Sequence, residues 1–126
     1  MEHAKPQPHK IHRIVVVEDD LDSVHTLALL LRELGHNVDY AINGYVALEV
    51  ARRFVADTVI CDIGLPGATG LEVARQLRKD PELSRVRLIA LTAYADQYTR
   101  KRALDAGFDA YYVKPISPDE LAKLFE

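Results

Sequence analysis

The chain has little of what disulfide-bonded, secreted or membrane proteins contain. Its single cysteine, Cys61, excludes an internal disulfide and is typical of a reducing compartment. No apolar run approaches the roughly 20 residues of a membrane helix, and the first ten residues have no signal-peptide core. These absences predict a cytoplasmic domain without membrane contact. Its net charge of −3, with both signs dispersed, argues against direct nucleic-acid binding.

The remaining composition is that of one globular domain of 126 residues. We expect residues 1–10 to form a flexible polar tail and residues 11–126 to form the domain. Within the domain, short β-rich runs alternate with helical periods. The expected strands are 11–17, 38–41, 58–61, 88–91 and 110–113, and the expected helices are 21–34, 45–54, 71–79, 96–106 and about nine residues from Pro118.

Five successive βα units predict an α/β fold with a doubly wound parallel sheet and helices on both faces. The common small version is flavodoxin-like, with strand order 2-1-3-4-5, and its ligands bind outside the carboxyl ends of the strands. Five polar residues follow or end these strands and should share one crevice: Glu18, Asp19, Asp62, Thr92 and Lys114.

The three carboxylates in this group should repel one another, by roughly 4 kcal/mol for a pair about 4 Å apart at an effective dielectric near 20. Mg²⁺ relieves such crowding because it binds carboxylate oxygens, and Mn²⁺ accepts the same ligands. A lysine and a hydroxyl beside the carboxylates can bind phosphoryl oxygens. The sequence therefore predicts phosphoryl transfer to a carboxylate, which gives an aspartyl phosphate.

Four segments carry a family resemblance: residues 15–20 (VVVEDD), 61–67 (CDIGLPG), 90–93 (ALTA) and 112–115 (YVKP). Together they resemble the receiver domains of two-component response regulators, which have a CheY-like fold. The resemblance implies that Asp62 accepts a phosphoryl group from a histidine kinase or a histidine phosphotransfer protein. It also implies a signalling module whose chemistry is limited to self-phosphorylation and autodephosphorylation.

The resemblance further assigns roles around Asp62. Asp19, Asp62 and the backbone carbonyl of Gly64 should bind Mg²⁺ directly, and Glu18 should bind it through water. Thr92 and Lys114 should contact the phosphoryl group. Thr92 and Tyr111 should act as the switch that changes the surface of the fourth helix, fifth strand and fifth helix, and the Lys114–Pro115 bond should be cis.

Two positions in the crevice differ from the commonest pattern of the family. Gly64, two residues after Asp62, has no side chain, whereas Tyr94, two residues after Thr92, is bulky. In the family these positions tune how fast water removes the phosphoryl group. An open side at Gly64 and a shield at Tyr94 act in opposite directions, so the sequence leaves the phosphoryl lifetime open.

Three other functions compete with a phosphoacceptor receiver. An aspartate-nucleophile phosphatase needs a second aspartate two residues after the nucleophile, where Gly64 stands. A flavodoxin-like FMN carrier needs a phosphate-binding loop after the first strand, where this chain has acidic residues. A pseudo-receiver that docks without phosphorylation would not need the complete set of site residues.

The remaining residues of note have simpler interpretations. Cys61 is expected in the core, His3, His9 and His12 in solvent, and Asp20 as a helix N-cap. Residues 100–102 (RKR) should form a solvated helix face. The last helix has an apolar stripe that, if exposed, would allow a homodimer. Part of the resemblance is to receivers of hybrid sensor histidine kinases, which favours such a parent.

Overall fold

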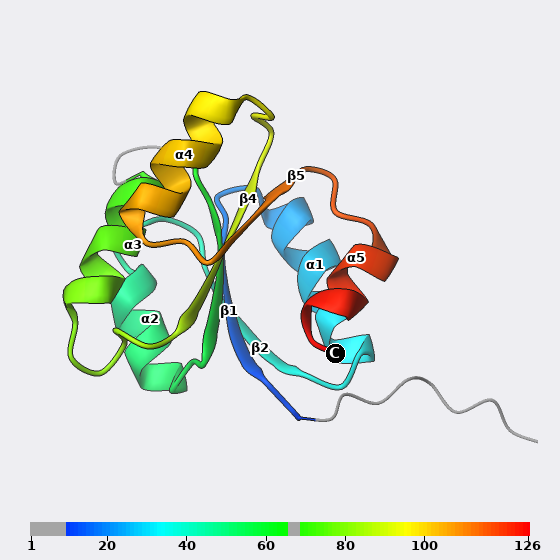
Figure 1. Cartoon of the computed structure of the whole chain (residues 1–126). Helices are drawn as coiled ribbons and strands as arrows, with labels where there is room; N and C mark the ends of the chain where they lie inside the picture. The colour runs from blue at the N-terminus through cyan, green and yellow to red at the C-terminus, as the bar shows by residue number, and fades with distance from the viewer. Residues whose placement is uncertain (1–9, 66–68) are drawn as a thin grey trace, which may run out of the picture.

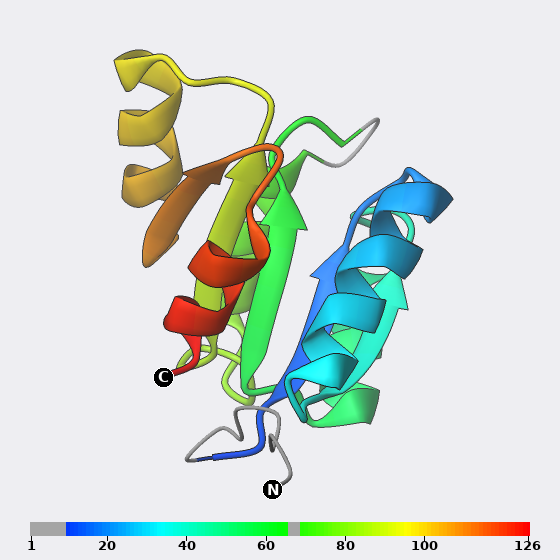
Figure 2. The same ribbon diagram turned by 90° about the vertical axis from the view of Figure 1, so that its right-hand side faces the viewer.

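The computed structural model describes residues 10–65 and 69–126, and it contains one five-stranded parallel sheet. The strand order is β2-β1-β3-β4-β5, as predicted, and Figure 2 shows the strands running in one direction. The strands are β1 (Arg13–Val17), β2 (Asn37–Ala41), β3 (Thr58–Asp62), β4 (Arg87–Thr92) and β5 (Ala110–Val113). Their carboxyl ends therefore meet at one edge of the sheet.

Helices cover both faces of this sheet (Figure 1). One face carries α1 (Leu21–Glu33) and α5 (Pro118–Leu124), and the other carries α2 (Ala47–Phe54), α3 (Gly70–Lys79) and α4 (Gln97–Ala106). The doubly wound α/β fold is thus confirmed. Among the residues that the structure describes, no helix combines the length and apolar character needed to cross a membrane.

Strand side chains alternate between two buried clusters, one on each face. Ile14 and Val16 of β1 pack with Leu121 and Leu124 of α5, whereas Val15 and Val17 belong to the opposite cluster. Cys61 is buried in that opposite cluster, as predicted, and burial raises the pKa of its thiol. The thiol therefore stays protonated and serves as core packing.

Local hydrogen bonds explain where the elements differ from the predicted bounds. Helix α2 begins at Ala47 because the Asn43 side chain accepts hydrogen bonds from the backbone of Tyr45 and Val46, which holds them in a turn. Asp20 is the N-cap residue of α1, as predicted. Its carboxylate accepts from the Ser23 hydroxyl at 2.6 Å rather than from a backbone N–H of the first turn.

Two further expectations about the ends of the domain need correction. His12 is only partly exposed, since its Nδ1 lies 3.1 Å from Asp57 Oδ1, so it is not a solvated tail residue. Helix α5 has seven residues rather than nine, and its apolar side chains Leu121 and Leu124, with Phe125 beyond its end, are buried within the domain. The stripe therefore does not provide the exposed dimer surface that the sequence suggested.

Several expectations fall outside the described residues. These are the flexible tail at residues 1–9, with His3 and His9, and positions 66–67 of the second motif. Residues 100–102 lie inside the described range and are exposed on α4, as predicted.

Candidate functional site

The carboxyl ends of β1 and β3 bring three acidic residues together. Glu18 and Asp19 follow β1, and Asp62 is the last residue of β3. One carboxylate oxygen from each lies within 4.8 Å of the other two. Glu18 is buried, whereas Asp19 is exposed, so the cluster opens to solvent on one side.

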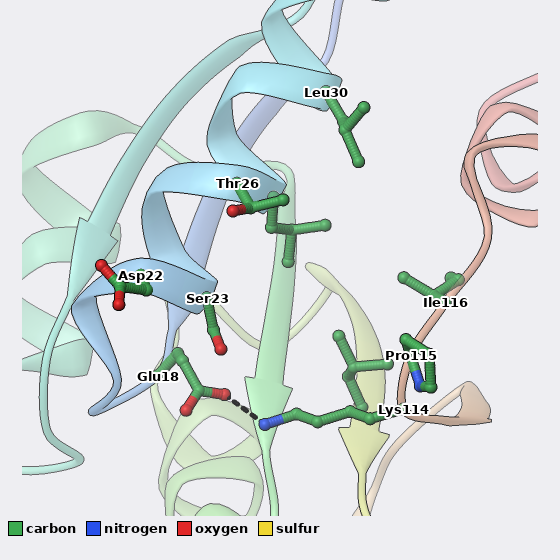
Figure 3. A pocket seen from close by; sticks show the side chains of 10 residues that line it. Glu18, Asp22, Ser23, Thr26, Leu30, Lys114, Pro115 and Ile116 are labelled. Carbon is green, nitrogen blue, oxygen red and sulfur yellow. Dashed lines mark hydrogen bonds and ion pairs between the residues drawn. The ribbon is translucent and has the colours of Figure 1, made fainter.

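Lys114 follows the edge strand β5 and reaches this cluster across the carboxyl end of the sheet. Its Nζ donates to Glu18 Oε2 at 2.6 Å and to Asp62 Oδ2 at 3.0 Å, and Figure 3 shows the lysine reaching the glutamate. The Lys114–Pro115 peptide bond before α5 is cis. The ammonium therefore balances part of the negative charge of the crevice.

The pKa values of this ion pair reflect both burial and mutual attraction. Burial raises the pKa of Glu18, and the hydrogen bond from Lys114 opposes that rise. For Lys114, burial lowers the pKa, but its bonds to Glu18 and Asp62 outweigh burial and leave the pKa above its usual value. Lys114 is consequently a fixed positive charge at neutral pH.

Two glycines shape the backbone around Asp62. The Gly64 N–H donates to Asp62 Oδ1 at 2.9 Å, which orients the carboxylate. Gly70, at the start of α3, lies so close to β3 that a Cβ there would stand 2.2 Å from the Asp62 carbonyl oxygen. The sequence analysis did not single out Gly70, because only the tertiary approach of α3 to the end of β3 reveals the need for glycine.

Thr92 and Tyr111 are connected through the backbone of Tyr94. The buried Thr92 hydroxyl accepts from the Tyr94 N–H at 3.2 Å, and the Tyr111 hydroxyl donates to the Tyr94 carbonyl. Tyr94 as a whole residue is 58% exposed, and Cε2 of its ring lies 3.8 Å from where a Gly64 Cβ would be. The bulky residue thus leans over the position that lacks a side chain.

A groove of ≈ 450 Å³ runs from the crevice along α1. In Figure 3, Thr26 and Leu30 of α1 stand on one side, Pro115 and Ile116 on the other, and the Glu18–Lys114 pair lies at the end. The groove therefore combines an apolar wall with the charged groups of the crevice.

The acidic cluster fits a hard divalent cation. All its side-chain donors are carboxylate oxygens, with no histidine or cysteine among them. This donor set suits Mg²⁺ and Mn²⁺ rather than zinc or copper. Lys114 binds one oxygen each of Glu18 and Asp62. The other oxygen of each accepts a single backbone N–H and keeps a lone pair for a metal, beside the carboxylate of Asp19.

Comparisons with known proteins agree with this geometry. The chain is 36% identical over 104 residues to the polar-differentiation response regulator DivK of Brucella anthropi, covering 82% of this chain and 85% of DivK. It is 38% identical to the DNA-binding response regulator MtrA of Mycobacterium tuberculosis, covering 86% of this chain and 46% of MtrA.

A solved structure extends the likeness to the crevice. The receiver domain of sensor histidine kinase PA1611 from Pseudomonas aeruginosa has a magnesium ion coordinated in its active site cleft. It is 33% identical, with a TM-score of 0.83 over 92% of this chain and 95% of that chain. The family profile described as "Response regulator receiver domain" matches residues 14–126. This chain therefore belongs to the response regulator receiver domains, the phosphoacceptor modules of two-component signalling.

Proposed function

We propose that Asp62 is the phosphoacceptor of this receiver domain. The observation that carries the proposal is the position of Lys114 Nζ, 3.0 Å from Asp62 Oδ2 and 2.6 Å from Glu18 Oε2. A fixed ammonium at that point can receive a phosphoryl oxygen while Asp62 attacks phosphorus. The outer face of the crevice, at exposed Asp19, is open to the donor.

In the forward step, an Asp62 carboxylate oxygen forms a bond to phosphorus and the phosphorus–nitrogen bond of a phosphohistidine breaks. The electron pair of that bond goes to the imidazole, which takes up a proton. Lys114 and the Thr92 hydroxyl then bind oxygens of the new acyl phosphate. Later attack by water returns the carboxylate and releases inorganic phosphate.

A divalent cation belongs to the same proposal. Asp19, Asp62 and the Gly64 carbonyl would hold Mg²⁺ directly, with Glu18 acting through water, and Mn²⁺ would take the same place. When bound, the metal supplies positive charge to the phosphoryl oxygens. The chain's own task is to position Asp62 and Lys114 around it.

In the proposed switch, the backbone of Tyr94 connects Thr92 with Tyr111. If the Thr92 hydroxyl turns toward the phosphoryl group, the hydrogen bond from the Tyr94 N–H changes. The Tyr94 carbonyl holds the Tyr111 hydroxyl, so Tyr111 on β5 is affected as well. The output would be a changed surface over α4, β5 and α5.

The partner in this proposal is a histidine kinase or a histidine phosphotransfer protein. The groove between α1 and the residues after β5 begins at Lys114 and has an apolar wall, which suits a protein donor that brings its histidine to Asp62. The likeness to the PA1611 receiver supports a hybrid sensor histidine kinase as parent. The natural gene on both sides of these residues would test that origin, and light scattering over a concentration series would test a homodimer.

The phosphoacceptor assignment can be tested with acetyl phosphate, a small donor that needs no partner. The chain is incubated with acetyl phosphate and Mg²⁺, and its intact mass is measured. We expect a gain of one phosphoryl group in the parent chain and in Asp105→Asn, an exposed position on α4. Asp62→Asn should gain none. Equal labelling of Asp62→Asn, or no labelling of the parent chain, would overturn the assignment.

A further inference from the structure

A cluster of three rings, two of them buried and that of His12 partly exposed, lies at the end of the sheet opposite the phosphoryl-transfer site. It joins His12 before β1, His36 before β2, and Phe125 after α5. The ring centroids of Phe125 lie 4.8 Å from His36 and 5.1 Å from His12, and the two histidines lie 5.2 Å apart. The end of α5 therefore packs on two titratable rings.

His36 can keep this arrangement only in its neutral form. Its Nδ1 accepts a hydrogen bond from the His12 backbone N–H at 3.0 Å, so the ring proton of the neutral form is on Nε2. The residue is 4% exposed, and Nε2 has no hydrogen-bond partner within residues 10–65 and 69–126. Protonation of Nδ1 would turn it into a donor facing the His12 N–H, so that hydrogen bond would be lost. It would also place a charge in a buried site.

The surrounding charges do not offset that cost. Asp57 favours a charged His36, but it already accepts from the Arg13 N–H, the Thr58 hydroxyl and His12 Nδ1. Burial, which is the largest influence, and then His12 lower the pKa of His36.

The cations on neighbouring elements are engaged elsewhere. Arg87 of β4 lies over the Phe125 ring, and Arg32 of α1 donates to the Val38 carbonyl. Because a guanidinium carries a positive charge and has no hydrogen-bond acceptor, neither arginine can stabilise a charged His36.

We propose that His36 is a proton-sensitive latch that holds the last turn of α5 on the sheet when neutral and releases it when protonated. Helix α5 has seven residues, and its end is fixed by Leu124, Phe125 and a hydrogen bond from Arg87 to the Leu124 carbonyl. Loss of the Phe125 contact therefore removes much of what holds this turn. Because α5 belongs to the proposed output surface, acid would change that surface without any change at Asp62.

The direction of the pH effect follows from linkage. A histidine whose pKa is lower in the closed form binds fewer protons there than in the open form. The latch is therefore fully closed above the ordinary histidine pKa of 6.5, and it weakens as pH falls below that value toward the lowered pKa. One proton taken up on opening gives a change of about tenfold in the opening equilibrium per pH unit.

Amide hydrogen exchange of the full chain, followed by NMR between pH 7.5 and 5.5, tests the latch. After correction for intrinsic exchange, the protection of the Phe125 and Glu126 amides should fall toward the tenfold-per-unit limit below pH 6.5. Protection of β1 and β3 should stay unchanged. Constant protection at α5, or a fall shared by the whole sheet, would overturn the proposal.

Variants identify the group that titrates. His36→Gln keeps a hydrogen-bond acceptor but does not titrate in this range, so α5 protection should become independent of pH. His25→Gln, at an exposed histidine on α1, should behave like the parent chain. If His36→Gln keeps the parent's pH dependence, His36 is not the latch.

The parent chain gives a second test if His36→Gln does not fold. The ring signals of His36 should report the Nε2-protonated tautomer at pH 7.5 and should titrate together with the loss of α5 protection. Titration of His36 with no change at α5 would contradict the proposal.

Discussion

At the residue scale, Tyr94 contributes to the site through its backbone and its ring separately. Its N–H and carbonyl connect Thr92 with Tyr111, whereas its ring leans over Gly64. If the proposed switch runs through Tyr94, the same residue is also placed to shield a phosphoryl group on Asp62. The sequence showed both the open position and the bulky residue but could not show that one covers the other.

Tyr94→Ala separates these two contributions, because alanine keeps the backbone bonds to Thr92 and Tyr111. We expect the variant to lose its phosphoryl group severalfold faster, since water would reach Asp62 over Gly64. The measurement is the decay of the phosphorylated mass after acetyl phosphate is removed. Tyr98→Ala provides the control, because Tyr98 is exposed on α4 beside Arg102. Unchanged or slower decay in Tyr94→Ala would mean that the ring does not shield the site.

At the scale of elements, α4 is attached to the domain chiefly by its C-terminal end. Its buried residues are Ala103 and Ala106, both in the second half of the helix. Beyond that end, Arg78 of α3 donates to the Gly107 carbonyl through Nε at 3.0 Å and Nη2 at 2.7 Å. The N-terminal half of α4, which follows Tyr94, has no buried residue and is thus freer to move with the proposed switch.

Arg78→Ala tests this anchor. The guanidinium also donates to the Ser84 and Val86 carbonyls and to the Asp109 carboxylate. Its loss leaves several acceptors without a donor and should lower the free energy of unfolding by about 2–3 kcal/mol. Urea unfolding measures the change. Arg75→Ala, on the same helix but in an exposed ion pair, should unfold like the parent chain. An equal loss of unfolding free energy in both variants would mean that the Arg78 hydrogen bonds do not stabilise the domain more than an exposed ion pair does.

The sequence predicted the order and type of these elements well because each local signal agreed with the fold. Apolar periods gave the helices, and the left-handed glycines Gly35 and Gly107 end α1 and α4. The Arg78 contacts and the beginning of α2 at Ala47 were missed for one reason. Both depend on side chains that bind backbone groups, Arg78 those of distant loops and Asn43 those of its own turn. Hydrophobic periodicity does not report such bonds.

At the scale of the whole molecule, the two ends of the sheet hold opposite kinds of titratable cluster. The carboxyl end gathers Glu18, Asp19 and Asp62 with Lys114, whereas the other end gathers His12 and His36 around Phe125. Topology predicted the first cluster because carboxyl ends of parallel strands converge. The second was missed, and His12 was misjudged as solvated. Its partners at positions 36, 57 and 125 come from loops and from the end of α5, which no strand pattern aligns.

Repulsion among the three carboxylates should lower the stability of the domain when no cation is bound. Asp19 adds an exposed negative charge beside two carboxylates that Lys114 only partly balances. Asp19→Asn should therefore raise the melting temperature in EDTA by about 1–4 °C, a modest gain since solvent screens the repulsion.

Excess Mg²⁺ should reverse that order of stability. A metal at 100 times its dissociation constant stabilises the domain that binds it by about 2.7 kcal/mol, so the parent chain should melt above Asp19→Asn when Mg²⁺ is added. Thermal melts of both proteins across a Mg²⁺ series would show the two curves crossing, whereas Asp22→Asn should follow the parent chain because Asp22 lies outside the cluster. Parallel curves that never cross would mean that Asp19 holds no metal, and the crevice would then owe its charge balance to Lys114 alone.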